Sequence, residues 1–108
     1  MNCTRIFYSK NINHLVLKDE DMANFVDDAL QRHAFNDWGN VVPADKQKND
    51  LAVYTGDRIF SLYHLPIKYK DNSFGKLGER ELSIMVISDP TNKKGVREKI
   101  SVLFPSEF

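Results

Sequence analysis

Apolar residues recur at helical spacing in the segment that follows Lys18. They occupy the i, i+3, i+4, i+7 and i+8 positions of one continuous stripe and are Met22, Phe25, Val26, Ala29 and Leu30. Residues 19–21 are acidic, while Arg32 and His33 are basic, as the helix dipole favours at its two ends. The pattern predicts an amphipathic helix that begins near Lys18 and has His33 in its last turn.

A second helix is expected after a break at Gly39, a residue that is free to adopt a positive φ. Pro43 suits the first helical position because its missing N–H would be unpaired there anyway. This helix should run to about Ala52 or Val53 and stop before Gly56.

Beyond Gly56 the apolar residues alternate as in β-strands, and each run ends at a proline or at Asp-Pro. Pro66 should end the first of these runs, because proline cannot donate to a sheet ladder. Polar loops at 67–80 and 91–98 join the runs and leave no room for crossover helices. The predicted strands are a short one at 4–8 and then Arg58–Leu65, Leu82–Ser88 and Lys99–Phe104. A turn is predicted at 11–13, after the first strand.

These elements predict one α+β domain over residues 1–108, with two N-terminal helices packed on an antiparallel meander of three to four strands. Hydrophobic residues make up 42% of the chain and charged residues 28%, which is ordinary for a globular protein. A single cysteine, Cys3, excludes an internal disulfide and a thiolate zinc cluster. We find neither a membrane-spanning stretch nor a secretory signal and expect a cytoplasmic protein.

The formal net charge is zero, from 15 basic and 15 acidic residues. This balance argues against a general nucleic-acid binder, which usually has a basic excess. Residues 1–57 nevertheless carry nine acids and six bases, while residues 58–108 carry six acids and nine bases. The asymmetry suggests a polarised surface. Nucleic-acid binding through the basic half is a weaker hypothesis, which predicts an affinity that falls steeply with salt.

The sequence contains no recognisable catalytic, metal or cofactor motif. His33 followed by Asp37, with Asp45 and Asp50 nearby, could form a base oriented by an acid. The favoured alternative is that His33 caps the carboxyl end of the first helix and Asp37 bonds a turn amide. Ser61 lacks the sequence of a nucleophile elbow and is expected to be a small sheet residue.

Candidate binding residues lie in three segments. Trp38 beside Asp37 could be a contact for a partner or a stacking platform, although a core position with a bonded indole N–H explains a lone tryptophan more simply. The two polar loops could present further contacts. The loop candidates are Tyr69 and Phe74 in the first loop and Lys93, Lys94 and Arg97 in the second.

Four ordered blocks carry a resemblance to a known family: His33–Val41, Asp45–Asp50, Gly56–Tyr63 and Leu103–Phe108. Over residues 30–108 the chain resembles a family of short proteins carried by plasmids, phages and integrative elements. Members share R-H-x-x-G-D-W-G, then D-x-x-x-N-D, then G-R-[LI]-[FL]-S-x-Y, and end in L-[FL]-P-x-[ED]-[YF]. The family has no established activity, so the resemblance implies a genetic setting rather than a reaction.

The chain departs from this family at Asn36, where a glycine is usual, and in longer loops at 66–80 and 90–98. The resemblance implies a small accessory protein of a mobile element that binds another protein. Such a protein could inhibit a host defence system, as anti-CRISPR and anti-restriction proteins do. The alternative is a small hydrolase-like enzyme that uses His33 and Asp37 near Trp38. No cofactor is expected, and the oligomeric state stays open.

Overall fold

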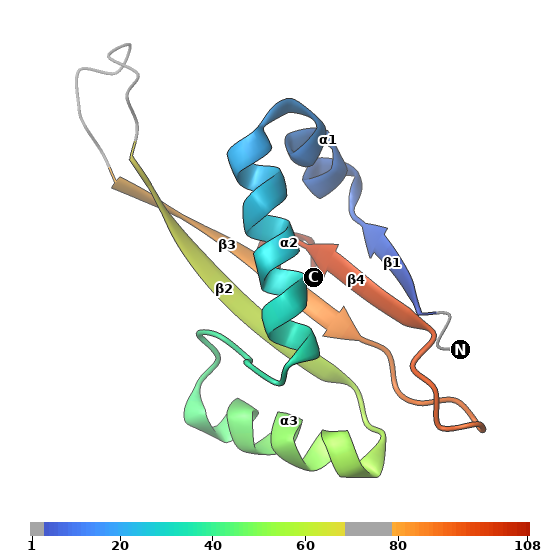
Figure 1. Ribbon diagram of the computed structural model, residues 1–108. Helices are drawn as coiled ribbons and strands as arrows, with labels where there is room; N and C mark the ends of the chain where they lie inside the picture. Colours follow the sequence, from blue (N-terminus) through green and yellow to red (C-terminus); the bar gives the residue numbers. More distant parts are fainter. Residues whose placement is uncertain (1–3, 69–78) are drawn as a thin grey trace.

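The computed structural model describes residues 4–68 and 79–108, so the predicted binding residues Tyr69 and Phe74 lie outside the described residues. The described residues form a four-stranded sheet in the order β1-β4-β3-β2 (Figure 1). The strands are β1 (Arg5–Tyr8), β2 (Ile59–Lys68), β3 (Glu79–Ser88) and β4 (Lys99–Leu103). The helices are α1 (Lys10–Lys18), α2 (Glu20–Ala34), α3 (Pro43–Thr55) and the short 3₁₀ turn η2 (Pro105–Glu107).

The predicted α+β class is confirmed, and β2, β3 and β4 form the expected antiparallel meander. The prediction was wrong for the rest of the sheet, because β1 pairs with β4 in parallel. It was also wrong in giving two helices before the meander, since the described residues contain three. The additional helix, α1, carries the chain back from β1 so that α2 can pack on the sheet.

The turn predicted at residues 11–13 is in fact the first part of α1. Ser9 caps this helix, and its hydroxyl oxygen accepts a hydrogen bond from the Ile12 N–H at 3.1 Å. Asp19 ends α1 and also caps α2, where its carboxylate accepts from the Asp21 N–H at 2.9 Å. Ile12 of α1 is buried, and Ile12, Leu15 and Val16 have the i, i+3, i+4 spacing of an apolar helix face, a signal that the predicted turn overlooked.

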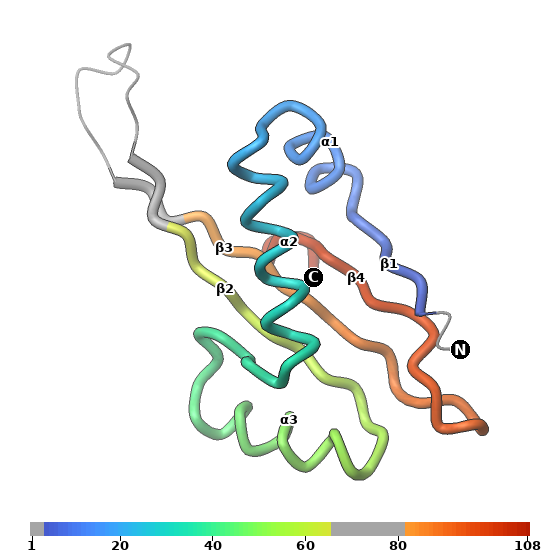
Figure 2. The backbone as a smooth tube through the Cα atoms, in the orientation of Figure 1, coloured from blue at the N-terminus to red at the C-terminus, as the bar shows by residue number. Residues whose placement is uncertain are grey.

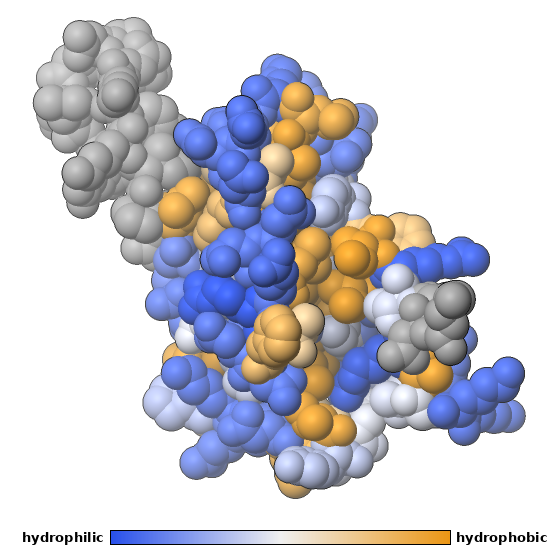
Figure 3. Space-filling model, in the orientation of Figure 1, coloured by the Kyte–Doolittle hydropathy of each residue, from blue (hydrophilic) through white to orange (hydrophobic). Residues whose placement is uncertain are grey.

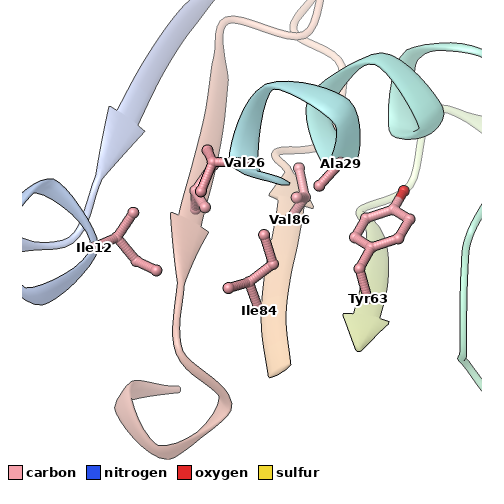
Figure 4. Close-up of a cluster of buried hydrophobic side chains, with 7 residues drawn as sticks. Ile12, Val26, Ala29, Tyr63, Ile84 and Val86 are labelled. Carbon is pink, nitrogen blue, oxygen red and sulfur yellow. The ribbon is translucent and has the colours of Figure 1, made fainter. Parts of the chain in front are cut away.

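The main core lies between one face of the sheet and the helices α1 and α2, and Figure 4 shows most of its side chains. The apolar stripe of α2 supplies Val26 and Ala29 to it, as its helical spacing predicts. The buried residues are Ile12, Val26, Ala29, Tyr63, Ile84, Val86 and Val102. A second cluster joins α3 to the start of β2 and consists of Trp38, Val41, Ala52 and Ile59.

Pro66 does not end β2, which continues to Lys68. The N–H groups of Phe60, Leu62 and His64 point away from β3, since each is bonded to a group outside the sheet. Pro66 lies two residues after His64 on this edge strand, so its nitrogen points the same way. Its missing N–H therefore falls at a position that needs no partner in β3, and the strand continues through it.

Candidate functional site

The segment between α2 and α3 runs along the outer edge of β2 (Figure 2). The Trp38 carbonyl accepts a bond from the Leu62 N–H at 3.2 Å, and the Asn40 N–H donates to the Leu62 carbonyl at 2.6 Å. From α3, the Asn49 side chain bonds the Phe60 N–H at 3.3 Å and the Phe60 carbonyl at 2.6 Å. These contacts protect the edge from pairing with another strand.

Asp37 and Gly39 fix the path of this segment. The Asp37 carboxylate accepts from the Arg32 guanidinium at 2.7 Å and from the Gly39 N–H at 3.1 Å, which confirms the turn-amide role. The bond from Arg32 holds the pKa of Asp37 below its usual value. Gly39 has a φ of +72°, and a Cβ there would collide with the Leu62 carbonyl and the Tyr63 ring.

Trp38 is a core residue, as its simpler interpretation predicted. Its side chain is buried in the second cluster, and the indole N–H donates to the Asp50 carboxylate at 2.8 Å. The partner is thus a carboxylate of α3. The indole also meets the ring of His33 edge to face, with the ring centroids 5.7 Å apart. Trp38 therefore joins α3 to the carboxyl end of α2.

His33 lies in the last turn of α2, but its ring faces the sheet. The imidazole is 5% exposed, and its Nδ1 lies 2.5 Å from the Ser61 hydroxyl of β2. Its Nε2 lies 2.6 Å from the Ser88 hydroxyl of β3. Burial and then the positive charge of Arg97 lower the pKa of His33 to about 4. The pairing of His33 with Asp37 that the enzyme hypothesis requires is not formed.

The Ser61–His33–Ser88 arrangement has the distances of a nucleophile and a base, but its electrostatics oppose catalysis. A neutral imidazole has one donor and one acceptor nitrogen, so one serine donates to the ring and the other accepts from it. A histidine that acts as the base becomes a positively charged imidazolium when it takes the proton. Burial and Arg97 disfavour that charge here, and both ring nitrogens bond serine hydroxyls rather than a carboxylate of the described residues. The arrangement instead ties α2 to β2 and β3.

Arg97 is one of the candidate binding residues of the second polar loop, and its guanidinium points inward. It donates to three backbone carbonyls, those of Asp57 at 2.6 Å, Asp89 at 2.9 Å and Ala52 at 2.9 Å. The last of these lies in the final turn of α3, where a cation is favoured by the helix dipole. Arg97 thus holds the loop between β3 and β4 against α3.

A cavity of about 360 Å³ is lined by residues of α2, of α3 and of the loop between β3 and β4. The buried side chains that line it include His33, Trp38 and Ser88. Around them, the cavity is lined by Ala34 and Asn36 at the end of α2, Val53 of α3, and Thr91, Gly95 and Val96 of the loop. This cavity is therefore the concave site next to Trp38.

Two of the predicted binding residues, Trp38 and Arg97, line this cavity, whereas Asp37 does not. Lys93 and Lys94 are exposed in the same loop as Arg97, but they do not line the cavity. Sequence reasoning missed Ser88 and Val53. A serine at the end of the apolar strand run was the available signal for Ser88, since a small polar residue in a buried strand needs a partner.

A scan against protein-family models, a search of curated proteins and a search of solved structures found no match to this chain. Within the described ranges, no three His, Cys, Asp or Glu side chains come together as a possible metal site. In the same part of the chain, no helix is long and apolar enough to cross a bilayer.

Proposed function

We propose that this protein acts by binding another protein, with the cavity beside His33 and Trp38 as the centre of the contact. The observation that supports this most is the exposure of large apolar side chains next to the cavity. Phe35 at the end of α2 is 85% exposed, and Val53, which lines the cavity, is 42% exposed. Tyr54, the next residue of α3, is 88% exposed.

Figure 3 shows apolar atoms at the surface near the carboxyl end of α2 and on α3. Exposed aromatic side chains around a pocket are typical of binding surfaces, in which one anchoring side chain of the partner fills the hollow and its neighbours exclude water. The cavity can hold such an anchor. Its lining offers an aromatic edge, an imidazole and apolar side chains.

As the partner we propose a component of a host defence system, such as a CRISPR effector or a restriction enzyme. The support for this finer proposal is the resemblance of residues 30–108 to proteins of plasmids, phages and integrative elements. In this setting the protein would protect the mobile element by occupying a surface that the defence complex needs.

The test is affinity capture with the purified full-length protein and surface variants, from hosts with and without a known defence system. Val53→Asp places a charge in the lining of the cavity, and Phe35→Asp places one between its lining residues Ala34 and Asn36. Leu17→Asp places the same charge at an exposed apolar residue of α1. We expect a stoichiometric partner to bind the wild type and Leu17→Asp but to be lost from the two cavity variants. Recovery of no such partner from any host would count against the proposal.

The defence role has a separate readout. Expression of the protein in cells that carry the captured defence system should raise the efficiency of plasmid transformation or phage plating, and Phe35→Asp should abolish the gain. A partner that is captured without any change in plating would retain the binding function and reject the role as a defence inhibitor.

A further inference from the structure

The sheet face turned away from α1 and α2 carries a phenylalanine at each end of one row of residues across its strands. Residues directly opposite one another on paired strands share a face, and neighbours along a strand alternate. Val86 and Val102 face the helices, so Ile87 and Ser101 face the other way. Ser101 pairs with Phe7 of β1, and Ile87 pairs with Phe60 of β2. The row across the four strands is therefore Phe7, Ser101, Ile87 and Phe60.

The next row on this face is mostly basic. Arg5 pairs with Lys99, and the Asp89 N–H donates to the Lys99 carbonyl at 3.0 Å. Arg58 directly precedes β2 and continues its register opposite Asp89. Three cations and one acid therefore lie beside the row that contains Phe7 and Phe60.

Two aromatic rings at this end of the sheet are accessible, those of Phe7 and Phe108, whereas Phe60 is half-buried against the second cluster. Phe7 is 47% exposed, and the Lys99 ammonium lies 5.3 Å from its ring centroid. Phe108 is 69% exposed, with the Arg58 guanidinium 5.6 Å from its ring centroid. Each ring thus already has a cation beside it, the combination that favours nucleobases and phosphates at one surface.

A groove of about 620 Å³ opens at the same place, between the start of β1 and β4 and the loop that precedes β4. Its lining includes Arg5, Phe7, Lys94 and Lys99. A turn holds Lys94 in position, because the Asn92 side chain accepts from the Lys94 N–H at 2.8 Å. We call Arg5, Phe7, Arg58, Lys94, Lys99 and Phe108 the basic sheet face.

The acids of this region only partly offset the cations. Asp89 and Glu98 also line the groove, and the Glu98 carboxylate is engaged by the Asn92 amide at 2.7 Å. Five acids, by contrast, lie between residues 19 and 28 on α2 and its cap. The net charge of zero therefore conceals a protein with an acidic helix and a basic sheet face.

We propose that the basic sheet face binds single-stranded nucleic acid. Arg5, Lys94 and Lys99 contact phosphates, and an unpaired base stacks on Phe7, with Arg58 and Phe108 extending the surface. The exposed rings favour this ligand over an acidic peptide, because a peptide carboxylate needs the cations but not a stacking platform. They also favour a single strand over a duplex, whose bases are already stacked on one another. This surface is separate from the cavity of the proposed protein contact.

The experiment is fluorescence anisotropy of the full-length protein with labelled oligothymidylate of about twelve nucleotides, within the usual site size of such surfaces. Three to four phosphate contacts predict roughly 20- to 50-fold weaker binding at about 200 mM than at about 50 mM salt. Phe7→Leu, which keeps an apolar residue but removes the stacking ring, should weaken binding roughly 5- to 100-fold. Lys99→Ala should weaken binding and reduce the salt dependence.

The matched control is Lys48→Ala, which removes one exposed cation from α3 and should leave the affinity unchanged. Poly-glutamate and a duplex of the same length serve as competing probes. Absence of binding to the single strand at low salt overturns the proposal. Poly-glutamate binding that equals oligothymidylate binding and is insensitive to Phe7→Leu also overturns it, and would assign the face to an acidic protein segment. None of these outcomes depends on the partner captured through the cavity.

Discussion

Acid should weaken this protein through His33 at pH values where carboxylates are still ionised. Burial and Arg97 hold the pKa of His33 at about 4 in the folded protein, against an ordinary value of 6.5. Between these two pH values His33 is protonated in the unfolded chain but neutral in the folded protein. The stability is therefore complete above pH 6.5 and falls as the pH is lowered toward about 4.

The magnitude follows from the difference between the two pKa values. Each unit corresponds to about 1.4 kcal/mol, so the shift of His33 is worth about 3 kcal/mol over the whole window. The imidazole is only 5% exposed, so screening by solvent removes little of this. For a domain of this size such a loss is a large part of the usual free energy of unfolding.

The assay is urea unfolding at a series of pH values, followed by the fluorescence of Trp38, the single tryptophan of the chain. The control is His33→Gln, which keeps an amide able to bond both serines but does not titrate. We expect the free energy of unfolding of the wild type to fall between pH 6.5 and 4 and that of His33→Gln to stay nearly level until carboxylates titrate. Parallel pH profiles of the two proteins would refute the reasoning.

Three further substitutions test the contacts around the site. Arg97→Met removes hydrogen bonds to three carbonyls and should lower the free energy of unfolding by about 2 kcal/mol or more at neutral pH. Because the positive charge beside His33 is also removed, the loss of stability between pH 6.5 and 4 should become smaller. An unchanged pH profile would contradict the electrostatic effect of Arg97 on His33. Gly39→Ala should cost about 2 kcal/mol or more in thermal unfolding, whereas Gly95→Ala, at a similar positive φ but in open space, should cost only about 1 kcal/mol. Asn49→Ala leaves the N–H and the carbonyl of Phe60 without their side-chain partner and should cost about 2 kcal/mol or more in thermal unfolding. The control is Gln47→Ala, at an exposed residue of the same helix, with an expected loss near zero. Equal losses for the two glycine variants, or for the Asn49 and Gln47 variants, would contradict the structural explanation.

The elements with strong local signals could be predicted from the sequence alone. The apolar stripe and charged ends predicted α2, and Pro43 and Gly56 correctly bounded α3, whose C-cap glycine has a φ of +81°. Alternating apolar runs predicted the strands of the meander, and Trp38 was correctly interpreted as a core residue. In each case the signal that was interpreted is a local pattern of neighbouring residues along the chain.

Only the tertiary structure decided the rest, because those features depend on residues far apart in the sequence. The parallel pairing of β1 with β4 joins segments more than 90 residues apart, and it places α1 where Ile12 and Val16 pack against the main core. His33 meets Ser61 and Ser88 only when α2 lies across β2 and β3. The same holds for charge. The sequence determined that acids and bases balance, but strand register determined that Arg5, Lys99 and Arg58 stand together on one face.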